Sequence, residues 1–341
     1  MKKFGIVIAL LFAGVFCFAK SVAVNYENEK YEELLKNENF DELISQINAV
    51  GEENFTLSEF YYLGVCNFLR GNDEEARGYF FKALEKAPKF FDAYDYIAGT
   101  YLYNNDFDNA IKNYEECLKI DPKSYRVLKY MGLSYESKND FKKALEYYER
   151  AYKVQKDGES SYNVAYCFYE LKNYKKAKSF ATKSLKFNND FATNNLMILI
   201  LYASGDYKSS EKYKAALRAA YEKSDDEAIK AKTYFPLMSF DYKDFSIIVY
   251  EKILLSGDFY DPLTCAIYKA DERMGTINLE YDAVTAELGV PYFLGADDYA
   301  SGEHLTYERG YESFPDFDVF IQDVKAALDC QLEVSASSQK N

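Results

Sequence analysis

Tryptophan is absent from this 341-residue chain, and histidine occurs once, as His304. The chain therefore lacks the aromatic residue that most often stacks on sugar rings, and any His-based catalysis has one candidate side chain. Also missing are a Gly-x-Ser-x-Gly elbow, a glycine-rich phosphate loop and a His-Glu-x-x-His metal motif. We predict no catalytic residues, no cofactor and no metal.

Basic residues are outnumbered, with 41 Lys and Arg against 55 Asp and Glu and a formal net charge of -14. Nucleic acid is therefore not expected as a partner. The imbalance is local, because residues 20–221 hold 31 acidic and 29 basic side chains, whereas residues 222–341 hold 24 and 10. This change in composition divides the chain into two parts.

Cysteines are few and widely spaced, which does not indicate a disulfide scaffold. Cys66, Cys117 and Cys167 fall within the helical repeats described below, and we expect them to pack as small apolar side chains. Cys265 and Cys330 both lie in the acidic part. Whether they pair depends on a distance that the sequence does not give.

One long apolar run, Gly5–Ala19, follows two lysines at the start of the chain. Its 15 residues fall short of the about 20 needed to span a bilayer, and the run ends in small residues. We interpret residues 1–19 as a signal peptide, cleaved after Ala19 or Ala23. The mature chain is then expected to be exported, periplasmic or secreted, without a transmembrane segment.

Two alternatives for the first residues remain open, an uncleaved anchor and a lipid on Cys17. The segment Gly14-Val15-Phe16-Cys17 is similar to a bacterial lipoprotein signal. It departs from that pattern at the bulky Phe16, where a small residue is required.

The chain repeats itself with a period of about 34 residues. Helical spacing places three columns of residues on one face of a helix. The columns are the alanines Ala76, Ala110, Ala144 and Ala177, the aromatics Phe80, Tyr114 and Tyr148, and the small residues Ala83, Cys117 and Ala151. Upstream, a large residue precedes a tiny one in Leu63-Gly64, Ile97-Ala98, Met131-Gly132 and Val164-Ala165. Each period therefore predicts two helices in close contact, a helical hairpin.

These columns, with Pro88 and Pro122 after the second helices, closely resemble the tetratricopeptide repeat. The resemblance covers residues 25–221 and implies an all-α fold, a right-handed α-solenoid of helical hairpins. The clear repeats are 57–90, 91–124, 125–158 and 158–190, and degenerate repeats occupy 25–56 and 191–221.

The resemblance also implies a concave groove, lined by the first helix of each hairpin, that captures a protein or peptide. Carried over to this sequence, the groove residues are Tyr61, Phe68, Asp95, Tyr103, Arg126, Lys129, Tyr162, Tyr166 and Tyr169. Tyrosine suits recognition because it offers a large contact area and a hydroxyl at little entropic cost. The alternative at each position is packing between neighbouring repeats.

For residues 222–341 we expect an acidic, mostly helical module. Asp261-Pro262 is typical of a helix start and predicts a helix that ends near Arg273. A hydrophobic stripe predicts an amphipathic helix over 316–332. Residues 289–315 show no period and are interpreted as a loop. Within that loop, Asp297–Glu308 has the spacing of a calcium loop but not its third ligand.

The sequence as a whole favours an exported scaffold or adaptor that binds a protein or peptide partner in the cell envelope, without catalysis. The alternative is an envelope hydrolase whose site lies in the acidic module, because 55 carboxylates offer many potential acid and base pairs.

Overall fold

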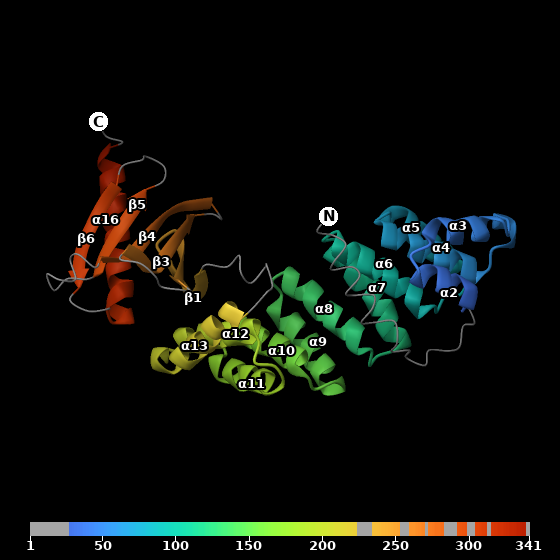
Figure 1. Cartoon of the computed structure of the whole chain (residues 1–341), viewed down its shortest axis with the longest axis horizontal. Helices are drawn as coiled ribbons and strands as arrows, with labels where there is room; N and C mark the ends of the chain where they lie inside the picture. Colours follow the sequence, from blue (N-terminus) through green and yellow to red (C-terminus); the bar gives the residue numbers. More distant parts are fainter. Residues whose placement is uncertain are drawn as a thin grey trace. The chain divides into compact units, whose positions relative to one another are not determined.

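A computed structural model describes residues 27–223, 234–252, 259–269, 272–282, 292–298, 304–311 and 315–338. The chain forms two compact units, Met1–Leu171 and Lys172–Asn341, which we describe separately (Figure 1). The predicted signal peptide lies outside the described residues. None of the helices in the described part has both the length and the apolar character needed to cross a bilayer.

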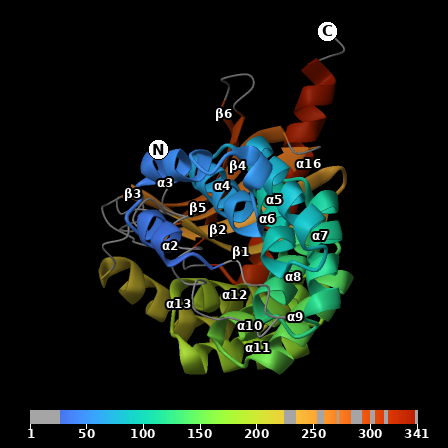
Figure 2. The same cartoon turned by 90° about the vertical axis from the view of Figure 1, so that its right-hand side faces the viewer.

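The first unit is helical. Its elements are α2 (Glu29–Lys36), α3 (Phe40–Asn48), the 3-10 turn η1 (Glu52–Asn54), α4 (Leu57–Arg70), α5 (Asp73–Lys86), α6 (Phe91–Tyr103), α7 (Phe107–Ile120), α8 (Tyr125–Ser137), α9 (Phe141–Val154) and α10 (Gly158–Glu170). Figure 2 shows the hairpins following one another from α4 and α5 to α8 and α9. The predicted array of helical hairpins is confirmed here.

Local capping sets where these helices begin and end. Thr56 and Glu59 form a capping box at the start of α4, and Asp106 accepts a hydrogen bond from the Asn109 backbone at the start of α7. Gly71 ends α4 in the left-handed region, with φ of 78°. Asn105 takes the same kind of conformation after α6, with φ of 59°. The chain therefore reverses between the two helices of these hairpins at short polar turns.

The columns of small residues lie where the two helices of a hairpin touch. Ala76, Ala110 and Ala144 are fully buried. A Cβ added at Gly132 would lie 2.5 Å from two ring carbons of Tyr148, well inside van der Waals contact. The second helix of a hairpin can therefore present a large ring only because the first helix presents no side chain opposite it.

Aromatic stacking joins neighbouring hairpins at two junctions of the array. The ring of Phe80 on α5 stacks on Tyr96 of α6, with centroids 5.0 Å apart and planes at 11°. One repeat later, Tyr114 on α7 stacks on Tyr130 of α8 at 5.8 Å and 13°. The same 16-residue offset recurs because the packing is repeated along the array.

The second unit combines helices with a sheet. Its elements are α11 (Tyr174–Phe187), α12 (Phe191–Ala203), α13 (Tyr207–Lys223), β1 (Tyr234–Tyr242), β2 (Phe245–Lys252), β3 (Phe259–Lys269), β4 (Glu272–Asp282), β5 (Tyr292–Asp298), β6 (His304–Tyr311) and α16 (Phe317–Ser338). The strands form an antiparallel meander in the order β1 to β6. Within this unit the helices α11 to α13 thus precede a six-stranded sheet.

The prediction of a mostly helical module after residue 222 is wrong. The expected helix after Asp261-Pro262 is strand β3, in which the register shifts between Tyr260 and Leu263. Proline lacks the backbone N–H of a ladder, and a bulge accommodates it inside a sheet. The expected loop over 289–315 contains β5 and β6, whereas the helix predicted at 316–332 is confirmed as α16.

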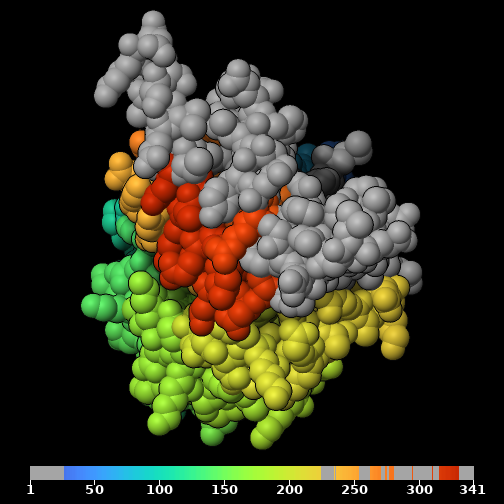
Figure 3. Space-filling view, turned by 90° about the vertical axis from the view of Figure 1, so that its left-hand side faces the viewer, coloured from blue at the N-terminus to red at the C-terminus, as the bar shows by residue number. Residues whose placement is uncertain are grey.

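One face of the sheet carries the core of the second unit. Alternate residues of the central strands, among them Val249, Cys265 and Ile277, are completely buried in one hydrophobic cluster. Phe320 and Val324 of α16 join that cluster, together with Ile198 of α12 and Leu217 of α13. Figure 3 shows α16 in red beside the yellow end of the helical array. The sheet thus has one face covered by α16 and the last hairpin.

Candidate functional site

The nine groove residues predicted from the sequence all lie on the first helices of hairpins in the first unit. Tyr61 and Phe68 are on α4, Asp95 and Tyr103 on α6, Arg126 and Lys129 on α8, and Tyr162, Tyr166 and Tyr169 on α10. We call the surface that carries them the first-helix face. Some of its side chains pack between neighbouring helices, and others remain partly exposed.

Tyr61 and Phe68 mainly hold neighbouring helices together. The ring of Tyr61 meets the ring of Tyr96 on α6 edge to face at 6.0 Å and that of Phe90 at 5.4 Å. Phe68 meets the same Tyr96 at 5.4 Å. Both rings belong to the border of a hydrophobic cluster in the first unit. At these two positions, packing between repeats is therefore a principal role of the side chain.

Asp95 and Arg126 form an ion pair that bridges α6 and α8. The Asp95 side chain is 3% exposed, and its Oδ1 has no hydrogen-bond partner among the described residues. The Arg126 side chain is 47% exposed, yet the surrounding protein lowers the pKa of its guanidinium by desolvation. An arginine stays charged even so. The pair joins two repeats and leaves a cation accessible between them.

A second polar bridge joins α8 to α10. Lys129 Nζ lies 2.5 Å from a carboxylate oxygen of Glu159 and 5.3 Å from the ring centroid of Tyr125. The hydroxyl of Tyr125 donates to Asp157, the N-cap of α10, at 3.0 Å. Arg126 and Lys129 are thus both paired with carboxylates of this chain.

The tyrosines of α10 form a half-buried stripe. Tyr162, Tyr166 and Tyr169 recur at helical spacing, and the rings of the first two are nearly parallel at 6.4 Å and 3°. Tyr166 also meets the ring of Phe141 at 6.1 Å. Burial, followed by the carboxylate of Glu170, raises the pKa of Tyr166, so its hydroxyl stays protonated. The stripe combines rings with hydroxyls that can donate hydrogen bonds.

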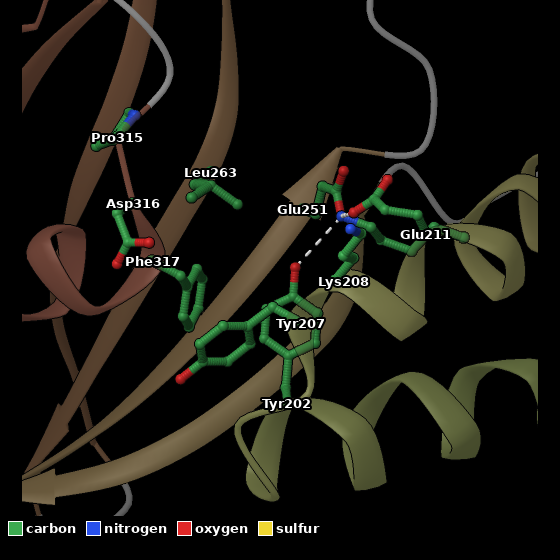
Figure 4. A pocket seen from close by; sticks show the side chains of 10 residues that line it. Tyr202, Tyr207, Lys208, Glu211, Glu251, Leu263, Pro315, Asp316 and Phe317 are labelled. Carbon is green, nitrogen blue, oxygen red and sulfur yellow. Dashed lines mark hydrogen bonds and ion pairs between the residues drawn. The ribbon is translucent and has the colours of Figure 1, made fainter.

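Sequence reasoning missed a cluster of charges inside the second unit (Figure 4). Lys214 on α13 is nearly buried and lies 3.0 Å from Glu251 on β2 and 2.7 Å from Glu211. Arg218 lies 2.6 Å from the other oxygen of Glu251, and Lys214 donates to the hydroxyl of Tyr202 at 3.3 Å. No local pattern predicts this cluster, because its residues come from a helix and a strand.

A shallow hollow of about 280 Å³ lies beside that cluster, walled by Tyr202, Tyr207 and Phe317, whose rings lie 4.8 to 5.1 Å apart. Burial disfavours the charge of Lys214, but Glu251 and its other partners outweigh burial and raise the pKa of the ammonium group. Lys214 therefore remains protonated at neutral pH and is unsuited to act as a base or nucleophile. Its chemistry here is to join α13 to β2.

The other predicted candidates in the acidic part lie at strand ends. His304 is the first residue of β6, and the window Asp297–Glu308 links β5 to β6 rather than two helices. Among the described residues, no group of His, Cys, Asp and Glu is arranged to hold a metal. Cys265 is a free thiol in the core, and burial raises its pKa.

The helical part of the chain is similar to a known protein family and to solved structures. The family model for the C-terminal ARM domain of tetratricopeptide repeat protein 21 matches residues 80–199. Part of a tetratricopeptide-repeat-containing protein from Cytophaga hutchinsonii is similar in structure, with 19% identity, a TM-score of 0.51, and coverage of 57% of this chain and 80% of that one. No curated protein matches the chain.

Two further solved structures align less closely. PilF of Pseudomonas aeruginosa is 16% identical over 57% of this chain and 90% of its own, with a TM-score of 0.48. The MamA protein is 15% identical over 49% of this chain and 92% of its own, with a TM-score of 0.47. The family match, the Cytophaga structure and the 34-residue hairpins identify the helical part of this chain as a tetratricopeptide-repeat array.

Proposed function

We propose that this chain is an exported scaffold or adaptor that binds a protein or peptide partner in the cell envelope, and that it does so without catalysis. The observation that carries the proposal is the first-helix face at α8 and α10. There, a 47% exposed arginine and three half-buried tyrosines lie on consecutive first helices. Aromatic residues and arginine dominate the binding energy of protein interfaces.

The bridges between helices support recognition by a rigid surface. Asp95 with Arg126 and Lys129 with Glu159 hold α6, α8 and α10 in fixed relation before a partner arrives. Side chains that are already ordered lose less entropy on binding. A partner segment that lies across α8 and α10 would meet rings, phenolic hydroxyls and one accessible guanidinium, a combination suited to an extended peptide with acidic and apolar residues.

Export rests on the first 19 residues, with their two lysines and 15-residue apolar run. In the proposal, the mature protein begins after Ala19 or Ala23 and carries no lipid. The intact mass of the protein from its native envelope tests this directly. A mature chain that starts at a lipid-modified Cys17 would contradict it and would assign the protein to a membrane surface.

The groove is tested by changing two of its rings. A partner is first identified by crosslinking in the envelope and then purified, so that its affinity can be measured by calorimetry. Replacing Tyr162 and Tyr169 with alanine should weaken binding by about 2 kcal/mol or more for each true anchor, about 30-fold. Tyr166 is retained because its ring packs on Phe141.

Phe81→Ala is the matched control, because Phe81 is 47% exposed on α5, a second helix outside the first-helix face. Both variants should have the helicity and the melting temperature of the wild type. If the double tyrosine variant is folded and binds with wild-type affinity, or if Phe81→Ala weakens binding as much, the first-helix face is not the binding surface.

A further inference from the structure

The face of the sheet that turns away from the core carries polar and aromatic residues. Strand alternation places Tyr250, Thr264, Tyr268, Thr276 and Asn278 opposite the buried residues of β2, β3 and β4. The register aligns them in rows across the strands. Thr264 pairs with both Tyr250 and Asn278, and Tyr268 pairs with Arg273.

Small side chains in the middle of this face and large ones at its margin produce a hollow of about 380 Å³. Its lining residues are Tyr234, Tyr250, Thr264, Ala266, Tyr268, Arg273, Thr276 and Asn278. At the centre, Ala266 and Thr276 pair with each other and are only 3% and 4% exposed, although neither belongs to the core cluster. The taller side chains around them therefore shelter a floor on the outer face.

The floor of the hollow contains an unused hydrogen-bond acceptor. Oδ1 of Asn278 is buried and has no hydrogen-bond partner among the described residues. A buried acceptor without a donor costs about 1–3 kcal/mol. Thr264 and Thr276 line the same hollow, and a threonine hydroxyl can donate or accept a hydrogen bond. A ligand that supplies hydroxyl donors would remove the cost at Asn278.

The wall of the hollow contains a cation in a strongly acidic protein. Arg273 is exposed and lines the hollow opposite Tyr268. Guanidinium groups bind carboxylates with two parallel hydrogen bonds. The tyrosine rings offer flat apolar surfaces, which in the absence of tryptophan are the remaining platforms for the C–H face of a sugar ring.

We propose that this hollow binds a small sugar acid, a molecule with one carboxylate and several hydroxyls on a ring. Its carboxylate pairs with Arg273, a hydroxyl donates to Asn278 Oδ1, and the ring lies against Tyr250 or Tyr268. A hydrocarbon would leave the Asn278 acceptor unsatisfied. A peptide strand adds to the edge of a sheet, whereas these residues lie on the face of the central strands β2 to β4.

The probe for this site is D-glucuronate, added to the full-length mature protein and followed by saturation-transfer NMR and calorimetry. D-glucose lacks the carboxylate, and acetate lacks the hydroxyls, so the two compounds test each half of the ligand separately. We expect glucuronate to bind more tightly than either one. Arg273→Gln should weaken glucuronate binding at least about tenfold, the loss of one charge-assisted contact.

Two further variants make the result specific. Lys269→Gln removes a cation from the same pair of strands but outside the hollow, and it should bind glucuronate as the wild type does. Asn278→Leu keeps a similar volume without the acceptor and should also weaken binding. The proposal is overturned if glucuronate binds with a Kd above about 10 mM, if glucose or acetate binds equally well, or if Arg273→Gln binds like Lys269→Gln.

Discussion

Replacing Gly132 with alanine should destabilise the first unit, although alanine is the better helix former. A Cβ built at Gly132 lies 2.5 Å from Cδ1 and Cε1 of Tyr148 and 2.8 Å from Cζ. The ring cannot move away freely, because Tyr148 is buried and its hydroxyl donates to Glu136 at 2.8 Å. The clash must therefore separate α8 from α9.

The size of the effect follows from two opposing contributions. Overpacking in a well-filled core costs about 1–3 kcal/mol, and contacts with three atoms of a fixed ring place this case in the upper half of that range. The gain in helix propensity from glycine to alanine is about 1 kcal/mol. We therefore expect Gly132→Ala to lower the free energy of unfolding by about 1–2 kcal/mol.

Urea unfolding followed by circular dichroism measures this change, and Gly78→Ala provides the matched control. Gly78 lies inside α5, is exposed, and has no atom within 4 Å of a built Cβ, so alanine there should stabilise by about 0.5–1 kcal/mol. In a Tyr148→Ala background, the cost of Gly132→Ala should disappear. The reasoning is refuted if Gly132→Ala shifts the midpoint upward as Gly78→Ala does.

Three further effects can be measured. Burial raises the pKa of Glu136, so the free energy of unfolding should fall as the pH rises from the usual glutamate pKa through the raised one. Glu136→Gln keeps an acceptor for the Tyr148 hydroxyl and should be more stable than the wild type at pH 7 but not near pH 4. Asp157→Ala removes the N-cap of α10 and should cost about 0.5–2 kcal/mol in urea unfolding. Cys265 is buried and burial raises its pKa, so iodoacetamide should modify it in urea and not in the native protein, and rapid native labelling followed by peptide mapping would contradict the core assignment.

The helical array could be predicted from sequence because each hairpin carries its own local signals. The turn at Asn104-Asn105-Asp106, the alanine at 110 and the aromatic at 114 lie within one repeat, and each has a separate physical cause. For the groove, the sequence predicted which helices carry the residues but not whether each side chain packs or stays accessible. Whether a ring such as Tyr61 packs or remains accessible depends on the next repeat, here on Tyr96 of α6.

The sheet was missed although part of its pattern was present. Burial alternates along β2, where Phe245, Ile247 and Val249 are buried. The helical periodicity of residues 25–221 nevertheless favoured more helix after them. Lys243 marks the error most clearly, because its φ of 53° belongs to a two-residue hairpin turn between β1 and β2.

The sequence of helix α12 indicated more clearly than β2 that a further layer of structure covers the end of the array. A terminal repeat in a solenoid needs one polar face toward solvent. The segment from Leu196 to Tyr202 is instead apolar at nearly every position, and six of its seven residues are buried. A helix that is apolar all round must be covered on every side.

The covering layer is the sheet, whose core cluster includes Ile198 and Tyr202 of α12 and Leu217 of α13. Lys214 and Arg218 extend the contact as paired charges on Glu251, which lies on the core-facing side of β2 because it follows Ile247 and Val249 at intervals of two residues. Removing residues after 223 would therefore expose apolar side chains of α12 and take away Glu251, the carboxylate that Lys214 and Arg218 share. The sheet and the end of the array should accordingly unfold together, as one cooperative unit.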